Sequence, residues 1–147
     1  MAHSYSRNHI HLVFSTKERR STISAERQAG LWAYIAGICK NHEMIPLAVG
    51  GTENHVHLLF NIPPTVALAK AVQALKANSS RWMGEQGTVF SWQEGYGAFG
   101  VSASNLDPLA RYIRNQKAHH RKFSFEDEYR ALLRNHDVSW DPEHLFG

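Results

Sequence analysis

Alternating apolar and polar residues predict three short β-strands in the first half of the chain. Residues 9–16 and 53–61 have a period of two, with an apolar row on one side and histidines on the other. Residues 43–50 read as a further strand, and Gly50-Gly51 as the turn of a hairpin between the second and third strands. The two apolar rows are Ile10, Leu12 and Phe14 in the first strand, and Val56, Leu58 and Phe60 in the third.

Longer segments with a helical period separate and follow these strands. Residues 24–41 carry leucine and isoleucine at helical spacing, and a second helix runs from about 63 to 84. Residues 88–102 are rich in aromatic residues and glycine, and they predict a fourth strand that runs into a loop. A helix over 107–120 and a short helix over 125–135 complete the predicted elements.

The predicted order of elements, β-α-β-β-α-β followed by helices, is that of the ferredoxin-like topology. We therefore expect an α+β fold in a single domain over residues 1–147, with one added C-terminal helix that carries Tyr112. In this topology the first and third strands are neighbours at the centre of the sheet, and two helices cover one face. If those helices bury the two apolar rows, both histidine rows share the opposite face.

Composition adds the expectation of a cytoplasmic protein that does not enter a membrane. Hydrophobic residues make up 43% of the chain, which fits a soluble globular domain. No stretch approaches the roughly 20 apolar residues that a membrane-spanning helix needs. Cys39 is the single cysteine, so neither an intrachain disulfide nor a cysteine-rich zinc site is available.

Positive charge is concentrated in two clusters, although the formal net charge is only +3. The clusters are KERR at 17–20 and RNQKAHHRK at 114–122, and both patterns are typical of phosphate-binding segments as well as of solvated surfaces. The second cluster ends a predicted helix, where the helix dipole favours cations. We therefore assign His119 and His120 no catalytic role.

Two near-identical motifs, NHIHLVF at 8–14 and NHVHLLF at 54–60, each place two histidines at positions i and i+2 of a predicted strand. Such side chains point to the same side, about 6–7 Å apart at the backbone, so two imidazoles can bind one metal ion. Two ligands hold a metal weakly, and a third has to come from elsewhere in the chain. The local pattern alone does not separate a metal site from structural histidines in either copy.

Tyr112 and Gln116 are four residues apart and share one face of the predicted helix over 107–120. On their own they read as a core tyrosine and a surface amide. Together with the histidine motifs, however, the chain resembles the HUH endonucleases with one catalytic tyrosine, in particular the small single-strand transposases of insertion sequences and their REP-associated relatives. The segments that carry the resemblance are HLVFSTKERR, GGTENHVHLLF, LKANSSRWM, WQEGYGAFGVS and YIRNQKAHH.

The resemblance implies a complete active site. Tyr112 would be the nucleophile, and His55, His57 and Gln116 would bind Mg²⁺ or Mn²⁺. His11 is expected to touch the site from the neighbouring strand. The implied reaction cuts and rejoins single-stranded DNA next to hairpins through a 5′-phosphotyrosine intermediate, and the implied assembly is a homodimer. The residues expected to contact the DNA are Lys17, Arg19, Arg20, Lys70, Lys76, Arg81, Trp92 and Tyr96.

Three other interpretations remain open at this point. The chain could be a domesticated nuclease of the same fold that binds repeat hairpins, or a non-catalytic ferredoxin-like domain that binds nucleic acid. A metal-independent phosphoesterase with two His-x-Thr/Ser motifs fits less well. Both motifs here end in histidine, and that chemistry leaves the Tyr112–Gln116 pair unexplained.

Overall fold

A four-stranded antiparallel sheet in the order β2-β3-β1-β4 forms the centre of the computed structural model, which describes residues 4–147. The strands are β1 (His9–Ser15), β2 (Ile45–Gly51), β3 (His55–Asn61) and β4 (Gly97–Gly100). With β1 and β3 at the centre, this order confirms the predicted ferredoxin-like topology.

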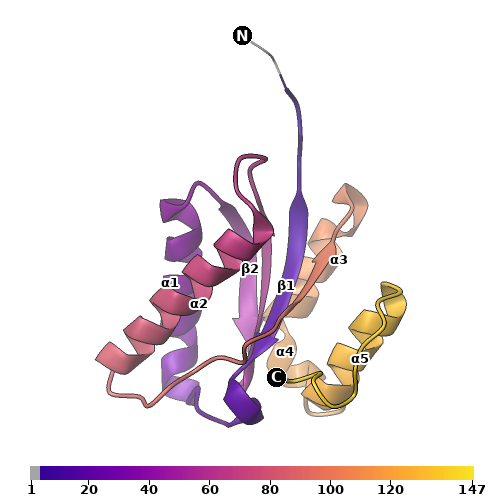
Figure 1. Cartoon of the computed structure of the whole chain (residues 1–147). Coiled ribbons are helices and arrows are strands. Elements are labelled where there is room, and N and C mark those ends of the chain that lie inside the picture. The colour runs from indigo at the N-terminus through magenta and orange to yellow at the C-terminus, as the bar shows by residue number, and fades with distance from the viewer. Residues whose placement is uncertain (1–3) are drawn as a thin grey trace.

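Helices lie on both faces of the sheet (Figure 1). On one face are α1 (Ala25–Asn41) and α2 (Leu68–Glu85), and on the other are α3 (Leu106–Arg114), α4 (Gln116–His119) and α5 (Phe125–Asn135). There are also two short 3-10 helices: η1 (Lys17–Arg19) follows β1, and η2 (Ala103–Asn105) precedes α3. Within residues 4–147, no helix combines the length and the hydrophobicity that crossing a membrane requires.

The main hydrophobic core fills the space between the sheet and the pair α1 and α2, as the alternation predicts. Burial of these apolar side chains is the dominant favourable contribution to the fold. Ile10 of the first predicted row is only partly buried and packs against this core. The core includes the rest of both rows and the inward faces of the two helices: Leu12, Phe14, Val56, Leu58, Phe60, Leu31, Ile35, Val72 and Leu75.

The register of β1 and β3 places both histidine rows on the opposite face. Ser15 pairs with His55, and Val13 pairs with His57. Directly paired residues of an antiparallel ladder project to the same side, so the two rows lie next to each other. Two smaller apolar clusters pack this face against the C-terminal helices, one through α5 and one through α3. The histidines are therefore buried between the sheet and these helices.

Two local predictions are corrected by close packing around β2 and β4. Gly50 and Gly51 lie inside β2, not in a turn. A Cβ atom on Gly50 would lie 2.1 Å from the carbonyl oxygen of Ile113, so glycine here allows the backbone of α3 to approach the sheet. The fourth strand is only four residues long, and the preceding segment forms an isolated β-bridge between Trp92 and Thr16.

The helix predicted over 107–120 is two helices. Asn115, with φ −105° and ψ 26°, interrupts it between α3 and α4. The chain therefore changes direction just before Gln116. This break brings the segment after it towards the histidine-bearing face of the sheet.

Candidate active site

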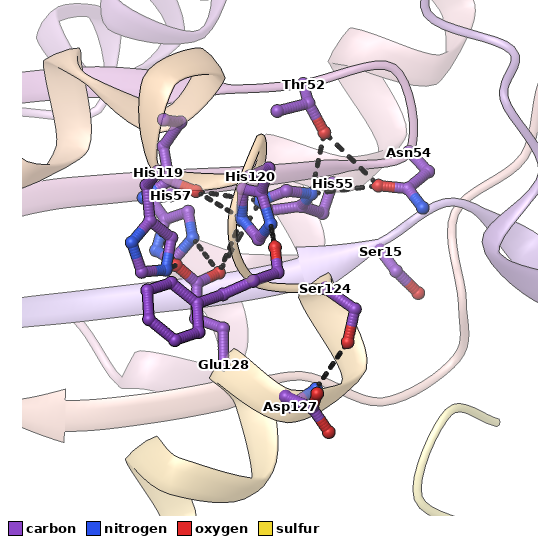
Figure 2. A network of polar contacts seen from close by, with 12 residues as sticks. Ser15, Thr52, Asn54, His55, His57, His119, His120, Ser124, Asp127 and Glu128 are labelled. Atoms are coloured by element: carbon purple, nitrogen blue, oxygen red, sulfur yellow. Dashed lines mark hydrogen bonds and ion pairs between the residues drawn. The ribbon is translucent and has the colours of Figure 1, made fainter.

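The strand β3 presents His55 and His57 side by side on the face covered by the C-terminal helices. Both are fully buried, and their ring centroids are 5.1 Å apart. Nδ1 of His55 lies 3.0 Å from the hydroxyl of Thr52 and 2.9 Å from Oδ1 of Asn54 (Figure 2). Partners of this kind fix the orientation of a ring and direct its other nitrogen, here Nε2, into the site.

His11 holds the second ring from the neighbouring strand. Its Nε2 lies 2.8 Å from Nδ1 of His57, and the two rings are stacked. Burial, followed by the proximity of His57, lowers the pKa of His11 well below its usual value and that of His55 to about 3. Both rings are therefore neutral at physiological pH, and a neutral imidazole is the form that binds a metal.

The break at Asn115 places Gln116 at the start of α4, directly over the histidine pair. Oε1 of the buried Gln116 lies 2.9 Å from Nε2 of His55. Tyr112, one turn earlier on α3, directs its ring towards His57, with the centroids 6.0 Å apart. The tyrosine and the amide thus reach the same site although they belong to two different helices.

Glu128, from α5, connects the tyrosine with the histidines. Its Oε1 accepts a hydrogen bond from Nε2 of His57 at 2.9 Å and lies 3.6 Å from Nε2 of His55. Its Oε2 accepts hydrogen bonds from the hydroxyl of Tyr112 and, at 3.2 Å, from Nε2 of Gln116. One buried carboxylate therefore contacts every site residue that the resemblance implies.

The surroundings of Glu128 keep it ionised. Burial raises the pKa of the carboxyl, but hydrogen bonds from His120 and His57 outweigh this effect and hold the pKa well below its usual range. The phenol of Tyr112 is affected in the opposite sense, because burial and the negative charge of Glu128 both raise its pKa. The resting site therefore holds a carboxylate and a protonated tyrosine.

The two adjacent histidines that follow Gln116 also face the site (Figure 2), which corrects their interpretation as the cationic end of a helix. Nε2 of His120 lies 2.9 Å from Oε1 of Gln116 and 3.2 Å from Oε1 of Glu128, and its Nδ1 lies 2.7 Å from the carbonyl oxygen of Phe123. Both ring nitrogens face acceptors, which a protonated ring satisfies. Burial lowers the pKa of His120, but the hydrogen bond to Glu128 outweighs it and the net shift is upward. His119 lies 3.2 Å from the hydroxyl of Tyr112.

Four of these side chains have the geometry of a metal site. His55, His57, His120 and Glu128 each place one ligand atom within 4.8 Å of the others. Imidazole nitrogen combined with carboxylate oxygen suits a divalent transition metal such as Mn²⁺. The donor set therefore fits the kind of cofactor that the resemblance implies, and Gln116 lies beside it.

Sequence reasoning missed Glu128 because it lies in an ordinary local pattern. The first turn of α5 contains three acidic residues, a common arrangement near the positive end of a helix. Of these three residues, Glu126 is partly exposed, Asp127 is exposed and Glu128 is buried. The helical period of the segment was the one available signal, since it places Glu128 on the same face as Phe125.

Two of the predicted DNA contacts are committed to the protein itself. Nζ of Lys76 donates hydrogen bonds of 2.7–3.0 Å to the carbonyl oxygens of Gln93, Glu94 and Gly95. Trp92 is only 8% exposed and packs edge-on against Phe14 in the core. The geometry gives both a role in holding the loop before β4, and leaves the ring of Trp92 without a face for a base.

The other predicted DNA contacts lie at or near the surface. Lys17, Arg19 and Arg20 lie in and beside η1, where Arg19 pairs with Glu126 at 3.4 Å. Lys70 and Arg81 are exposed on α2, on the opposite face of the sheet, and Tyr96 is 37% exposed. Their contact with DNA stays a prediction.

A ferredoxin-like sheet that carries a His-x-His pair, with a tyrosine on a following helix directed at that pair, is the arrangement of the single-tyrosine HUH transposases. The family model of IS200-like transposases matches residues 4–116. The chain therefore belongs to the IS200-like transposase family, and the predicted likeness is confirmed. The matched region ends at Gln116, so His120 and Glu128 lie beyond it.

Individual relatives agree with this assignment. The transposases for insertion sequence element IS200 of Salmonella typhimurium and Salmonella typhi are each 27% identical over 86 residues, which is 58% of this chain and 57% of theirs. The chain thus spans little more than half of the length of these curated relatives.

Two solved structures share the fold. A crystal structure of a candidate transposase from Deinococcus radiodurans R1 has a TM-score of 0.63 and 25% identity, covering 79% of this chain and 95% of that one. The REP-associated tyrosine transposase bound to a REP hairpin has a TM-score of 0.61 and 14% identity, covering 96% of this chain and 91% of that one.

Proposed function

We propose that this protein is a DNA transposase that cuts and rejoins single-stranded DNA next to hairpins through a 5′-phosphotyrosine at Tyr112, with a divalent metal at His55 and His57. One observation carries the proposal. The hydroxyl of Tyr112 and the inward nitrogens of both histidines meet at the same buried carboxylate, Glu128, within a single chain.

The proposed metal ligands are Nε2 of His55, Nε2 of His57 and Oε1 of Gln116, as the resemblance implies, with Oε1 of Glu128 as an additional ligand and His120 beside them. The family resemblance favours Mg²⁺ or Mn²⁺, and the two imidazoles favour Mn²⁺. When bound, such an ion polarises the scissile phosphate and stabilises the charge that develops on its oxygens. Glu128 supplies the negative charge of the ligand set, and His11 keeps His57 correctly oriented.

Tyr112 would attack the phosphorus. A bond forms between the phenolic oxygen and phosphorus as the bond from phosphorus to the 3′ oxygen breaks. The phenol has to lose its proton during this step, since its pKa is raised. Two atoms are in position to receive that proton, namely Oε2 of Glu128 and Nε2 of His119. The products are a 5′-phosphotyrosyl link and a free 3′-hydroxyl, and a second 3′-hydroxyl can reverse the step without ATP.

Hairpin DNA as the substrate is supported by the relative that was solved with a REP hairpin, and we extend that ligand class to this chain.

The predicted homodimer is a separate matter. Tyr112 reaches His57 and Glu128 of its own chain, so one copy contains all the side chains of the proposed site. Light scattering at several protein concentrations, with and without the hairpin, tests the dimer.

The main test is covalent capture of DNA. A single-stranded hairpin oligonucleotide from the DNA that flanks the coding sequence, labelled at its 3′ end, is incubated with Mn²⁺ or Mg²⁺ and analysed on a denaturing gel. We expect a labelled protein adduct with wild type and none with Tyr112→Phe, which still binds the oligonucleotide. An adduct that persists in Tyr112→Phe would disprove the nucleophile. Binding without any adduct would indicate a non-catalytic domain.

The twin motifs offer a matched control for the metal site. His55→Ala is expected to abolish both cleavage and tight Mn²⁺ binding. His9→Ala removes a histidine of the other copy, at the far end of β1 where it pairs with Asn61, and both properties should survive. Equal losses in the two variants would show that the copies have been assigned wrongly.

A further inference from the structure

An open cleft beside Tyr112 has a basic lining. Its volume is about 570 Å³, and it lies between the end of α3, α4 and the segment that leads to α5. Arg111, Arg121 and Lys122 line it, and no aspartate or glutamate does. All three cations are exposed, and within residues 4–147 none of them forms an ion pair. The cleft therefore offers positive charge that the fold itself does not use.

An exposed aromatic side chain stands at the rim of this cleft. Phe123 is 55% exposed and follows Arg121 and Lys122 directly in the sequence. Its ring stacks on His119, with the centroids 5.2 Å apart and the planes at 26°. His119 in turn lies edge-on to Tyr112, with the centroids 5.0 Å apart. A row of three rings thus leads from the surface to the proposed nucleophile.

The same row separates two cavities. A second one of about 590 Å³ lies between α3 and α5 and shares Tyr112, His119 and Phe123 with the basic cleft. Its other walls are mixed, with Leu109 and Leu132 among the apolar lining residues and Glu128, Arg134 and Asn135 among the polar or charged ones. A strand laid across the three rings would have the cations Arg111, Arg121 and Lys122 on one side, where they can face its phosphates. On the other side it would have both apolar side chains and hydrogen-bonding groups, which can face its bases.

We propose that this ridge and the basic cleft form the subsite for the single strand next to the scissile phosphate. Phosphates of that strand lie against Arg111, Arg121 and Lys122, and one unpaired base stacks on Phe123. Binding of single strands commonly combines a cationic groove with aromatic stacking platforms. The proposal rests on the proposed function for its choice of DNA. Most of the subsite lies after residue 116, beyond the region matched by the family model.

The experiment measures binding of a fluorescein-labelled single-stranded (dT)20 by anisotropy, in EDTA and with Tyr112→Phe as the parent, so that neither metal nor cleavage contributes. Replacing a phosphate-contacting cation lowers the slope of log K against log salt concentration by about 0.7 for a single strand. We therefore expect the double variant Arg121→Ala/Lys122→Ala to lower the slope by about 1.4. Lys40→Ala removes an exposed cation at the end of α1, on the opposite face, and should leave the slope unchanged.

The stacking platform has a different signature. Phe123→Ala should weaken binding roughly 5- to 160-fold with the salt slope unchanged, because a stacked base is lost but no phosphate contact is. Phe123→Leu, which keeps an apolar side chain without an aromatic face, should behave like the alanine variant. Phe123→Trp should restore binding. Circular dichroism verifies that each variant is folded. If Phe123→Ala does not fold, the affinity of Phe123→Leu serves as the test of stacking.

Unchanged affinity in both Phe123 variants together with an unchanged slope in the double variant would overturn the proposal. The adduct assay separates this failure from that of the proposed function. If wild type forms the adduct while the cleft variants bind normally, the subsite is wrong and the function stands. If the cleft variants show both signatures while wild type forms no adduct, the subsite stands and the transposase chemistry is wrong.

Discussion

Glu128→Gln probes the residue that joins the proposed nucleophile to the proposed metal ligands. The substitution keeps the shape of the side chain but removes its negative charge. In the structure, Oε1 of Glu128 lies 2.9 Å from Nε2 of His57, and Oε2 accepts a hydrogen bond from the hydroxyl of Tyr112. The amide cannot accept that proton as a base, and it removes the one anionic ligand of the candidate metal site. Asp127→Asn is the matched control, because the side chain of Asp127 is 74% exposed.

Two effects of different size are expected. Loss of a general base typically slows a reaction by about 10²–10⁴-fold, which corresponds to roughly 2.7–5.4 kcal/mol in the barrier. Loss of a metal ligand should weaken Mn²⁺ binding by at least about 10-fold, since even partners of ligands contribute that much. The rate of adduct formation is measured in single-turnover experiments over a range of Mn²⁺ concentrations, and Mn²⁺ affinity by isothermal titration calorimetry.

The dependence on metal concentration separates the two roles of Glu128. A defect that excess Mn²⁺ fully corrects indicates a ligand only, whereas a defect that persists at saturation indicates that the carboxylate also accepts the proton. Rates and affinities that stay within about threefold of wild type would refute both roles, because the loss of a general base or of a metal ligand has a larger effect than this. Asp127→Asn should match wild type in both measurements.

Three further predictions concern stability and packing. Gly50→Ala places a Cβ atom 2.1 Å from the carbonyl oxygen of Ile113. The free energy of unfolding, measured by urea denaturation, should therefore fall by roughly 1–3 kcal/mol. Adduct formation should also slow, because the added atom displaces α3. Gly37→Ala, at a helix position with nothing within 4 Å, should not destabilise. The pKa of His55 falls to about 3 in the folded protein, below its value in the unfolded chain. As pH drops below about 6.5, His55 therefore takes up a proton in the unfolded chain but stays neutral in the folded protein. This favours the unfolded chain, so the unfolding free energy falls as pH falls. In EDTA, from about pH 8 to about pH 5, the unfolding free energy of wild type should fall by roughly 2 kcal/mol more than that of His55→Gln; equal decreases would contradict this. Lys76→Met removes hydrogen bonds to three loop carbonyls; amide exchange in that loop should accelerate while the rest of the sheet stays protected.

Periodicity in the sequence was sufficient to predict the framework of the fold. The alternation in β1 and β3 depends only on neighbouring residues, and a strand places every second side chain on one face whatever surrounds it. The order of elements then restricted the topology to the ferredoxin-like arrangement, which placed both histidine rows on one face. Helix α5 was predicted with the bounds that the structure has, Phe125–Asn135.

Which side chains lie around the histidine pair depends on tertiary structure. Glu128 and His120 come from segments whose local patterns are ordinary, and they reach the histidines because the chain breaks at Asn115 and α5 then packs on the sheet. The same packing turned Gly50 into a point of contact with α3. Contacts between residues far apart in sequence depend on how whole elements pack, which no local period encodes. The sequence therefore determined the strands, the topology and the twin histidine motifs, whereas only the folded chain decided which side chains complete the site around one of them.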